Sequence, residues 1–406
     1  MANPNMERKL RCTIIGAGVS GILMAYKLQK HLSEYVDFWI YEKSPELGGT
    51  WYENRYPGCA CDVPSHVYQY SFAPNPEWSQ YYASSAEIQQ YLKTVVHHFN
   101  LEKFIHYNSP ITHASWDPSR AVWTVLVENH GAVDSELLIN ASGILNHPQM
   151  PDIRGLSTFQ GPLLHTASWD PAIRLENKRV AVIGAGASAI QLLPKIQPIC
   201  AQVDVYIRTP SWISPPVALQ HDGTDTNKNK NNNKNPCYSK DDITRFRTDT
   251  QQYLSTRKQM ESQFNDKFRA FMKKTPEQRA LRAQFEDRMK QLLPDPYLQS
   301  KLIPSFEVGC RRINPGEEYL VALQKPNVHP VFDRIQQIGP EGVTVQRNSD
   351  EHHRPVDILI AATGFNTTFR PRFPIVGAGG ANLQDLWSGE PTAYMGLAVA
   401  GFSNYL

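Results

Sequence analysis

Residues 11–21 read Arg11-Cys-Thr-Ile-Ile-Gly16-Ala-Gly18-Val-Ser-Gly21, and this stretch decides the fold. The apolar run before the first glycine predicts a buried strand, and the periodic apolar stretch from Ile22 to Leu32 predicts a helix. In such a unit the first glycine permits a tight turn, and the second lets the backbone approach a pyrophosphate at the helix N-terminus. The third glycine allows the helix to pack closely on the strand. We therefore predict that Gly16, Gly18 and Gly21 open a dinucleotide-binding unit.

A carboxylate follows the next predicted strand. Val36 to Tyr41 is rich in apolar residues, and Glu42 comes directly after it. A carboxylate in this place can accept hydrogen bonds from ribose hydroxyls. The interval from Gly16 to Glu42 exceeds the usual ~20 residues, which a longer helix and turn would accommodate. A structural glycine turn is the alternative, but the strand, the helix and Glu42 together favour a nucleotide site.

The same pattern returns near the middle of the chain. Residues 179–189 read Arg179-Val-Ala-Val-Ile-Gly184-Ala-Gly186-Ala-Ser-Ala189, and alanine is an accepted small residue in the third position. The strand predicted at Val203 to Ile207 ends on Arg208-Thr209 in place of an acid. A carboxylate there would repel the 2′-phosphate of NADPH, whereas a guanidinium binds it with two parallel hydrogen bonds. The second unit is therefore predicted to bind NADPH, with an ordinary surface arginine as the alternative for Arg208.

The two predicted nucleotide units differ in the residue that would face the ribose, which is Glu42 in the first and Arg208 in the second. This difference indicates one tightly held and one exchanging cofactor, as in hydride transfer from a nicotinamide to a flavin. We predict an α/β fold with two dinucleotide-binding, Rossmann-like domains, for FAD and NADP, and a helical insertion in the NADP domain. The predicted boundaries are 1–147 and 365–406 for the FAD domain, 148–212 and 301–364 for the NADP domain, and 213–300 for a disordered loop plus the helical insertion.

The loop and the insertion follow from composition. His221 to Asn235 is almost entirely Asn, Lys, Asp and Thr, which is typical of a solvated, disordered segment. Helix-forming residues predominate from Asp241 to Leu293. Further strands are predicted at Ala121–Val127, Glu136–Ile139 and Val343–Val345 and within the apolar run Asp357–Ala362, and the residues after 365 are predicted to be rich in loops.

Composition argues against several other classes of protein. The net charge of +2 over 406 residues gives no reason to expect nucleic acid as a partner. No apolar window approaches the ~20 residues of a spanning helix, so we expect no membrane segment. The six scattered cysteines predict reduced thiols and therefore a cytoplasmic protein. Cys59 and Cys61 lack a second pair to complete a ligand set, so no metal site is expected.

Two longer motifs carry a resemblance to a known family. Residues 48–62 read Gly48-Gly-Thr-Trp51-Tyr-Glu-Asn-Arg-Tyr56-Pro-Gly-Cys-Ala-Cys-Asp62, and residues 159–170 read Phe159-Gln-Gly-Pro-Leu-Leu-His165-Thr-Ala-Ser-Trp169-Asp170. The first resembles the signature of class B flavoprotein monooxygenases of the Baeyer–Villiger type, and the second resembles their Phe-x-Gly-x-x-x-His-x-x-x-Trp fingerprint. Residues 139–143 and 357–364 are similar to the family's two linker motifs. The amino-acid sequence of the motifs is most similar to that of fungal enzymes of secondary metabolism.

The resemblance implies an enzyme that uses FAD and NADPH to insert one oxygen atom of O2 beside the carbonyl of a small-molecule ketone, through a flavin C4a-peroxide. It implies Arg312 as the catalytic cation and Asp62 as the carboxylate that orients it, with a plain ion pair as the alternative. The motifs give no direct chemical role to His165. The cofactor-binding residues predicted or implied are Gly16, Gly18, Gly21, Glu42, Gly49, Thr50, Trp51, Asp62, Tyr68, Gly184, Gly186, Ser188, Arg208, Thr209, Arg311, Thr363 and Gly364.

Three alternatives stay open at this point. An N- or S-oxygenating flavin monooxygenase usually has Tyr or Phe in place of Trp169. A flavin disulfide reductase needs a redox cysteine pair, and Cys59 and Cys61 are separated by one residue where two are usual. The family continues past the position of Leu406, so we also expect an incomplete FAD domain, and a truncated non-catalytic remnant is the third alternative. The sequence predicts neither the substrate nor the oligomeric state.

Overall fold

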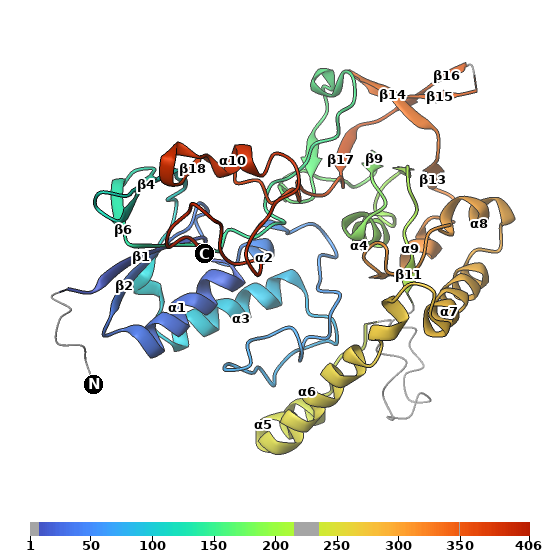
Figure 1. The fold of residues 1–406 in the computed structure, drawn as a ribbon. Coiled ribbons are helices and arrows are strands. Elements are labelled where there is room, and N and C mark those ends of the chain that lie inside the picture. Colours follow the sequence, from blue (N-terminus) through green and yellow to red (C-terminus); the bar gives the residue numbers. More distant parts are fainter. Residues whose placement is uncertain (1–7, 215–234, 349) are drawn as a thin grey trace. The chain divides into compact units, whose positions relative to one another are not determined.

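A computed structural model describes residues 8–214, 235–348 and 350–406, which belong to two compact units. The first unit comprises Met1–Glu53, Ile88–Pro148 and Phe365–Leu406, and the second comprises Asn54–Glu87 and Gln149–Gly364. Figure 1 traces the chain through both units. The predicted FAD domain included residues 54–87, whereas in the structure this segment packs with the second unit.

The first unit is built on a four-stranded parallel sheet. Its order is β3-β2-β1-β7, formed by Ile105–His106, Val36–Tyr41, Leu10–Ile15 and Leu137–Asn140. Helix α1 (Val19–Leu32) packs on β1 and β2, and Ile14 and Ile40 are fully buried beneath it. Because all four strands run in the same direction, their carboxyl ends meet at one edge of the sheet, where ligands bind in open α/β sheets.

A second sheet of the first unit is partly built from the last residues of the chain. Its order is β18-β4-β5-β6, formed by Ile375–Val376, Ile111–Asp117, Val122–Val127 and Gly131–Ser135. Helix α3 (Ser85–His98) begins in the second unit and continues in the first, and the short helix α10 (Leu383–Leu386) is the last helix of the chain. Most of residues 365–406 are loops, as predicted.

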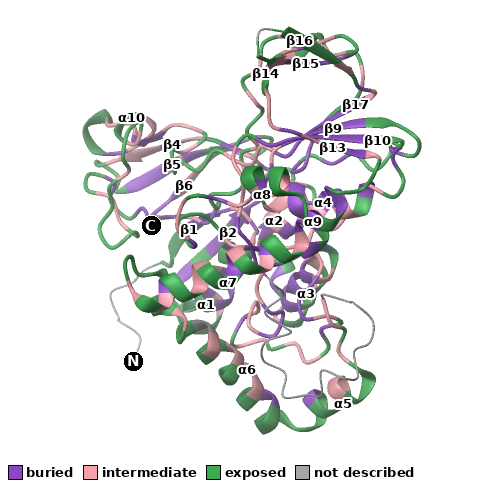
Figure 2. Cartoon of the chain, turned by 90° about the vertical axis from the view of Figure 1, so that its right-hand side faces the viewer, coloured by how far each residue is buried: buried purple, intermediate pink, exposed green. Residues whose placement is uncertain are grey.

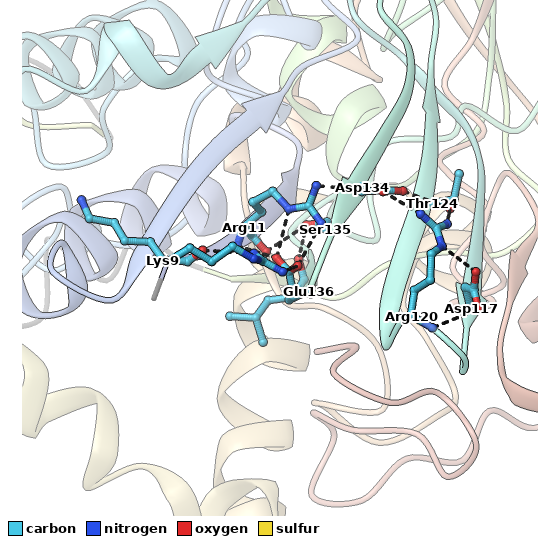
Figure 3. Close-up of polar contacts among 10 residues, drawn as sticks. Lys9, Arg11, Asp117, Arg120, Thr124, Asp134, Ser135 and Glu136 are labelled. Atoms are coloured by element: carbon cyan, nitrogen blue, oxygen red, sulfur yellow. Dashed lines mark hydrogen bonds and ion pairs between the residues drawn. The ribbon is translucent and has the colours of Figure 1, made fainter. Parts of the chain in front are cut away.

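A charged network lies where the two sheets of the first unit meet, at the start of β1. Figure 3 shows Arg11 beside Glu136, and Arg120 joined to Asp117 and Asp134. Glu136 accepts hydrogen bonds from the Arg11 backbone (2.7 Å), the Arg11 guanidinium (2.9 Å) and the Arg8 guanidinium (2.6 Å). Burial alone would raise the pKa of Glu136, but these arginine contacts hold it well below its usual value. This network stabilises the start of β1, at the end of the strand opposite the glycine turn.

The second unit contains a five-stranded parallel sheet. Its order is β13-β10-β9-β17-β8, formed by Val328–Val331, Gln202–Tyr206, Arg179–Ile183, Ile358–Ala361 and Leu163–His165. Alternate residues of β9 face opposite sides. Val180 and Val182 pack with α4 (Ala187–Ile196) and α9 (Glu317–Ala322), while Ala181 and Ile183 pack with an antiparallel meander of β14 (Arg334–Gly339), β15 (Gly342–Arg347) and β16 (Asp350–Pro355). Figure 2 shows these parallel strands as buried.

The predicted helical insertion is present and is divided into several helices. They are α5 (Lys240–Thr248), α6 (Thr250–Asn265), the 3-10 turn η4 (Phe268–Phe271), α7 (Pro276–Leu292) and α8 (Pro296–Leu302). The break before α7 arises because Thr275 caps the new helix and Pro276 begins it. Of the predicted disordered segment 221–235, all but Asn235 lies outside the described residues. Two short strands, β11 (Ile213–Ser214) and β12 (Asn314–Pro315), pair beside the insertion.

No helix within the described ranges has the length and apolar character required to cross a membrane.

Candidate functional site

The turn after β1 has the geometry of a pyrophosphate cradle. Gly16 has a φ of +96°, and a Cβ on it would lie 3.1 Å from the carbonyl oxygen of Ala141. A Cβ on Gly21 would lie 1.9 Å from the carbonyl oxygen of Gly16, so only glycine allows this approach of α1 to the turn. Gly18 caps α1 without a side-chain hydrogen bond, and no acid stands in the first turn. The N-terminus of α1 therefore has no side-chain cap and no acid, and its dipole favours an anion.

Gly49 lies against this turn. It has a φ of +52°, and its Cβ position is 3.1 Å from the Cα of Gly18. Two glycines facing each other leave only backbone at this point, which suits the close approach of a phosphate. Thr50 and Trp51 begin helix α2 (Thr50–Glu53), and Trp51 is buried. The predicted residues 49–51 thus lie beside the first glycine turn.

Glu42 is held at the end of β2 by the backbone. The N–H of Ala17 donates to one carboxylate oxygen at 2.7 Å, and the N–H of Ser44 donates to the other at 2.8 Å. The residue is only 4% exposed. Each carboxylate oxygen has two acceptor positions, so each retains one for a ribose hydroxyl. The residues of the first turn therefore fit a dinucleotide such as FAD.

The turn after β9 repeats the first turn in the second unit. Gly184 has a φ of +127°, and its Cβ position is 2.3 Å from the carbonyl oxygen of Ala362, after β17. Gly186 caps α4 without a side-chain hydrogen bond, and a Cβ on it would meet nothing within 4 Å. Ala189, in the third position, is fully buried. The N-terminus of α4 is thus a second open anion site.

Arg208 and Thr209 follow β10 at the same edge of the sheet. Arg208 is exposed and has no ion-pair partner in the part of the chain that the structure describes. The Ser211 hydroxyl donates to the carbonyl of Ala185 at 2.8 Å and fastens this segment to the glycine turn. An unpaired guanidinium here fits the 2′-phosphate of NADPH. Ser211 was not predicted from the sequence, because a serine two residues after Thr209 belongs to no recognisable motif.

Asp62 and Arg312 are brought together although 250 residues separate them in sequence. The pair is bidentate: Arg312 Nη2 donates to Oδ1 at 2.5 Å, and Nε donates to Oδ2. The Asp62 side chain is 14% exposed and the Arg312 side chain 64%. The hydrogen bond to Asp62 raises the pKa of Arg312 against the effect of burial, and Cys61 and Tyr68 lie close enough to raise it further. Because two of five N–H groups bind Asp62, the others stay available to a substrate.

The Tyr-Pro-Gly motif (residues 56–58) packs the loop that leads to Asp62 against helix α4. Tyr56 donates to Gln191 Oε1 at 2.7 Å, and Gln191 Nε2 donates to the carbonyl of Ala60 at 2.9 Å. A Cβ on Gly58 would lie 2.4 Å from the carbonyl oxygen of Gln191. Burial raises the pKa of Tyr56, and the nearby Ser188, in the first turn of α4, partly offsets this rise. Gln191 was missed by sequence reasoning because nothing in its spacing marks it.

The thiols of this motif have no redox partner. All six cysteines are free, and burial raises the pKa of Cys61 to about 12 and also raises that of Cys59. Both are therefore protonated near neutral pH and poor nucleophiles for disulfide exchange. This argues against the disulfide reductase alternative. No three His, Cys, Asp or Glu side chains gather as a metal site within the described residues.

The remaining predicted residues have diverse surroundings. The Arg311 guanidinium lies over the Phe306 ring, 5.3 Å from its centroid, and is not drawn into the Asp62 pair. The Thr363 hydroxyl donates to the carbonyl of Gln149, and Gly364 has a φ of +77° in the second linker motif. His165 is buried at the end of β8, and its Nδ1 accepts from the N–H of Ala167 at 3.0 Å. Burial lowers the pKa of His165, so its ring is neutral and structural.

Each unit contains a parallel sheet in which one strand leads through a glycine turn into a helix without a side-chain cap. This arrangement defines a protein with two dinucleotide sites. Residues 9–228 match the flavin-binding monooxygenase-like family. The chain belongs to this family. It is 40% identical over 405 residues to the FAD-binding monooxygenase tazF of Aspergillus terreus, covering 98% of this chain and 70% of that protein.

Two further matches agree. A Baeyer–Villiger monooxygenase of Streptomyces coelicolor is 34% identical over 402 residues, covering 99% of this chain and 73% of that protein. The crystal structure of OTEMO in complex with FAD and NADP superimposes with a TM-score of 0.83 and 26% identity, covering 98% of this chain and 79% of that one. These matches confirm the predicted family, the α/β fold and the assignment to the flavin-dependent monooxygenases.

Proposed function

We propose that this chain uses FAD and NADPH to insert one oxygen atom of O2 beside the carbonyl of a small-molecule ketone, giving an ester or lactone, in fungal secondary metabolism. The Asp62–Arg312 pair carries this proposal, because a fixed cation beside a carbonyl is what this chemistry needs. The similarity to a Baeyer–Villiger monooxygenase and to a fungal FAD-binding monooxygenase supports it. The free thiols support a reducing compartment such as the cytoplasm.

The two cofactors are assigned by their ribose ends. Glu42 accepts hydroxyl donors and disfavours a 2′-phosphate, which suits FAD in the first unit. Arg208 is exposed and unpaired within the described ranges, which suits NADPH in the second. The OTEMO structure named above contains FAD and NADP together.

The chain's own residues supply charge and orientation. When bound, FAD supplies hydride acceptance from NADPH and the activation of oxygen. Attack on a ketone carbonyl places negative charge on the carbonyl oxygen, and Arg312 would stabilise that charge. Asp62 holds the guanidinium through two hydrogen bonds and prevents it from rotating away. The raised pKa of Arg312 keeps it cationic during the reaction.

Replacing the cation tests the proposal. In the full chain, Arg312→Ala should reduce ester formation by at least ~100-fold, the typical loss for a group that stabilises a transition-state charge. Anaerobic reduction of the flavin by NADPH should survive, because the hydride donor does not need this cation. Product is measured by mass spectrometry, and flavin reduction by the loss of its absorbance. Arg347→Ala is the control, since Arg347 is exposed on β15 and forms no ion pair among the described residues.

Two results would refute the proposal. Ester formation at the wild-type rate in Arg312→Ala would remove Arg312 from the reaction. Oxygenation of thioethers or amines with no turnover of any ketone would assign the chain to the N- or S-oxygenating enzymes.

A further inference from the structure

Helix α6 contacts the loop that follows Asp62 through one buried tyrosine. The Tyr253 hydroxyl donates to the carbonyl of Asn75 at 2.6 Å. The same oxygen lies 3.0 Å from His66 Nδ1 and 3.1 Å from Gln69 Nε2. His66 is fully buried, and Tyr253 is 4% exposed. A single hydroxyl of the helical insertion thus joins three residues of the loop.

The directions of these hydrogen bonds fix the tautomer of His66. Tyr253 has one hydrogen, which it gives to Asn75, so His66 must donate to it through Nδ1. His66 Nε2 then carries a lone pair, and it is buried with no hydrogen-bond partner in the described part of the chain. Burial, together with the nearby charge of Arg257, lowers the pKa of His66 to about 4. The ring therefore acts as a neutral donor at ordinary assay pH.

The loop depends on this helix for its shape. The described residues 54–84 contain no helix or regular strand. The Arg257 side chain donates to the carbonyl of His66 at 3.1 Å, and the rings of Tyr238 and Phe246 stand edge-on to His66, with centroids 4.6 and 5.0 Å away. The N–H of Tyr81 donates to the carbonyl of Pro236 at 2.9 Å. The contacts come from the segment leading to α5 and from α5 and α6 themselves.

The same loop carries the carboxylate of the candidate site. Asp62 stands four residues before His66, and a tight turn lies between them, because the N–H groups of Val67 and Tyr68 both donate to the carbonyl of Pro64 at 2.9 Å. Tyr68 is also close enough to Arg312 to raise its pKa. A shift of His66 would therefore pass through this turn to Asp62, which binds Arg312.

We propose that Tyr253, acting through His66, is a positioning residue that holds Asp62 against Arg312 during oxygenation. This inference rests on the proposed function. A 1 Å error in a positioned group is costly even when the group itself is intact. The helical insertion thereby contributes to catalysis without touching the reacting atoms.

Tyr253→Phe tests the inference in the full chain with FAD, NADPH and a ketone that the wild type converts. The variant removes only the hydroxyl. We expect the fraction of NADPH that yields ester to fall about 5-fold, with the remaining electrons reducing O2 to H2O2, while anaerobic flavin reduction stays within about 2-fold of wild type. Hydrogen–deuterium exchange at residues 65–75 should become faster. Tyr297→Phe is the matched control, because Tyr297 is 57% exposed on α8.

A pair of histidine variants distinguishes positioning from a general loss of packing. His66→Asn keeps an N–H donor near the place of Nδ1 and has no counterpart of Nε2, so it should retain most of the wild-type coupling. His66→Leu has no donor and should behave like Tyr253→Phe. Equal losses in the Asn and Leu variants would overturn the inference, because they would give the essential role to Nε2.

The experiments can refute the positioning role of Tyr253 without refuting the proposed oxygenation of a ketone. If the wild type makes ester and Tyr253→Phe shows unchanged coupling and exchange, only the positioning role is refuted. If the wild type consumes NADPH and makes no ester from any ketone, both proposals fail together.

Discussion

The two glycine turns share one design and differ at two places. In both, the first glycine has a positive φ and lies against the backbone of a linker motif, at Ala141 in the first unit and Ala362 in the second. Both helices that follow lack a side-chain cap, whereas α5, α7, α8 and α10 each have one. The differences lie in the third small residue and in the residue that ends the second strand.

These differences indicate how firmly each cofactor would be held. Gly21 lets α1 approach the turn more closely than a methyl group would permit, and Glu42 is already fixed by two backbone N–H groups. The first site is therefore organised before its ligand binds. In the second unit Ala189 leaves a wider approach, and Arg208 is exposed and must be ordered on binding. A rigid site suits a resident cofactor, and an adjustable one suits a cofactor that leaves after each turnover.

The largest effect is expected from exchanging the third small residue. Gly21→Ala places a methyl group 1.9 Å from a carbonyl oxygen, so α1 must move away from the turn. We expect a colourless protein, with flavin content below about one tenth of wild type, because a displaced α1 no longer presents its N-terminus to the pyrophosphate. Flavin absorbance per protein is the measurement. Ala189→Gly in the other turn should remain yellow; a yellow Gly21→Ala protein would contradict the close-approach argument.

A smaller effect is expected at the ribose end. Arg208→Ala should raise KM for NADPH about 10- to 50-fold, the loss of one charge-assisted bidentate contact, and should leave KM for NADH within about 2-fold. Steady-state kinetics with both nucleotides provides the measurement. A parallel rise in both KM values would show that Arg208 does not recognise the 2′-phosphate.

Gly186→Ala should separate binding from folding. A Cβ on Gly186 meets nothing within 4 Å in the chain itself, so the unfolding midpoint should not change. A bound pyrophosphate would approach this position, so KM for NADPH should rise about 5- to 10-fold. Gly389→Ala, which also points into open space, is the control for both measurements. An unchanged KM would mean that the phosphate does not lie on this turn.

The smallest effect concerns acid stability, which should differ between the units. Folded protein keeps His66 neutral down to a pKa of about 4, while the unfolded chain binds a proton near 6.5, so the second unit loses stability as pH falls from 6.5 to 4. The loss should be about 1 kcal/mol between pH 7 and pH 5.5. Glu136 in the first unit has a lowered pKa, so its contribution is lost only below about 4.5.

Chemical denaturation of wild type and His66→Asn across this pH range tests the difference. The variant should lack the part of the slope between pH 6.5 and 4. An identical slope in both proteins would mean that His66 does not titrate as its burial requires.

Local features were predictable from the sequence. The strand Val36–Tyr41 was predicted to the residue, and both glycine turns, Glu42 and Arg208 occur where the motifs indicated. Such features depend on short-range sterics and on periodic burial, which a sequence displays directly. The helical character of 241–293 was also correct, but its division at 266–275 was not predicted.

Long-range contacts were not predictable in the same way. The assignment of residues 54–87 to the second unit depends on Gly58 packing against α4 and on Tyr253 binding the loop, and neither contact has a spacing that marks it. The Asp62–Arg312 contact was implied by family resemblance alone. Its catalytic role remains a prediction until Arg312→Ala is assayed.

The two units receive their described residues at different stages of the chain. Residues 365–406 supply β18 to the first unit, and the Trp123 side chain donates to the carbonyl of Ser403 at 2.9 Å. The described residues of the second unit end at Gly364. During synthesis on the ribosome, strand β18 therefore becomes available to the first unit only after all described residues of the second unit have been made. A nascent chain paused after Gly364 would carry every described strand of the second unit, while the first unit would still lack β18.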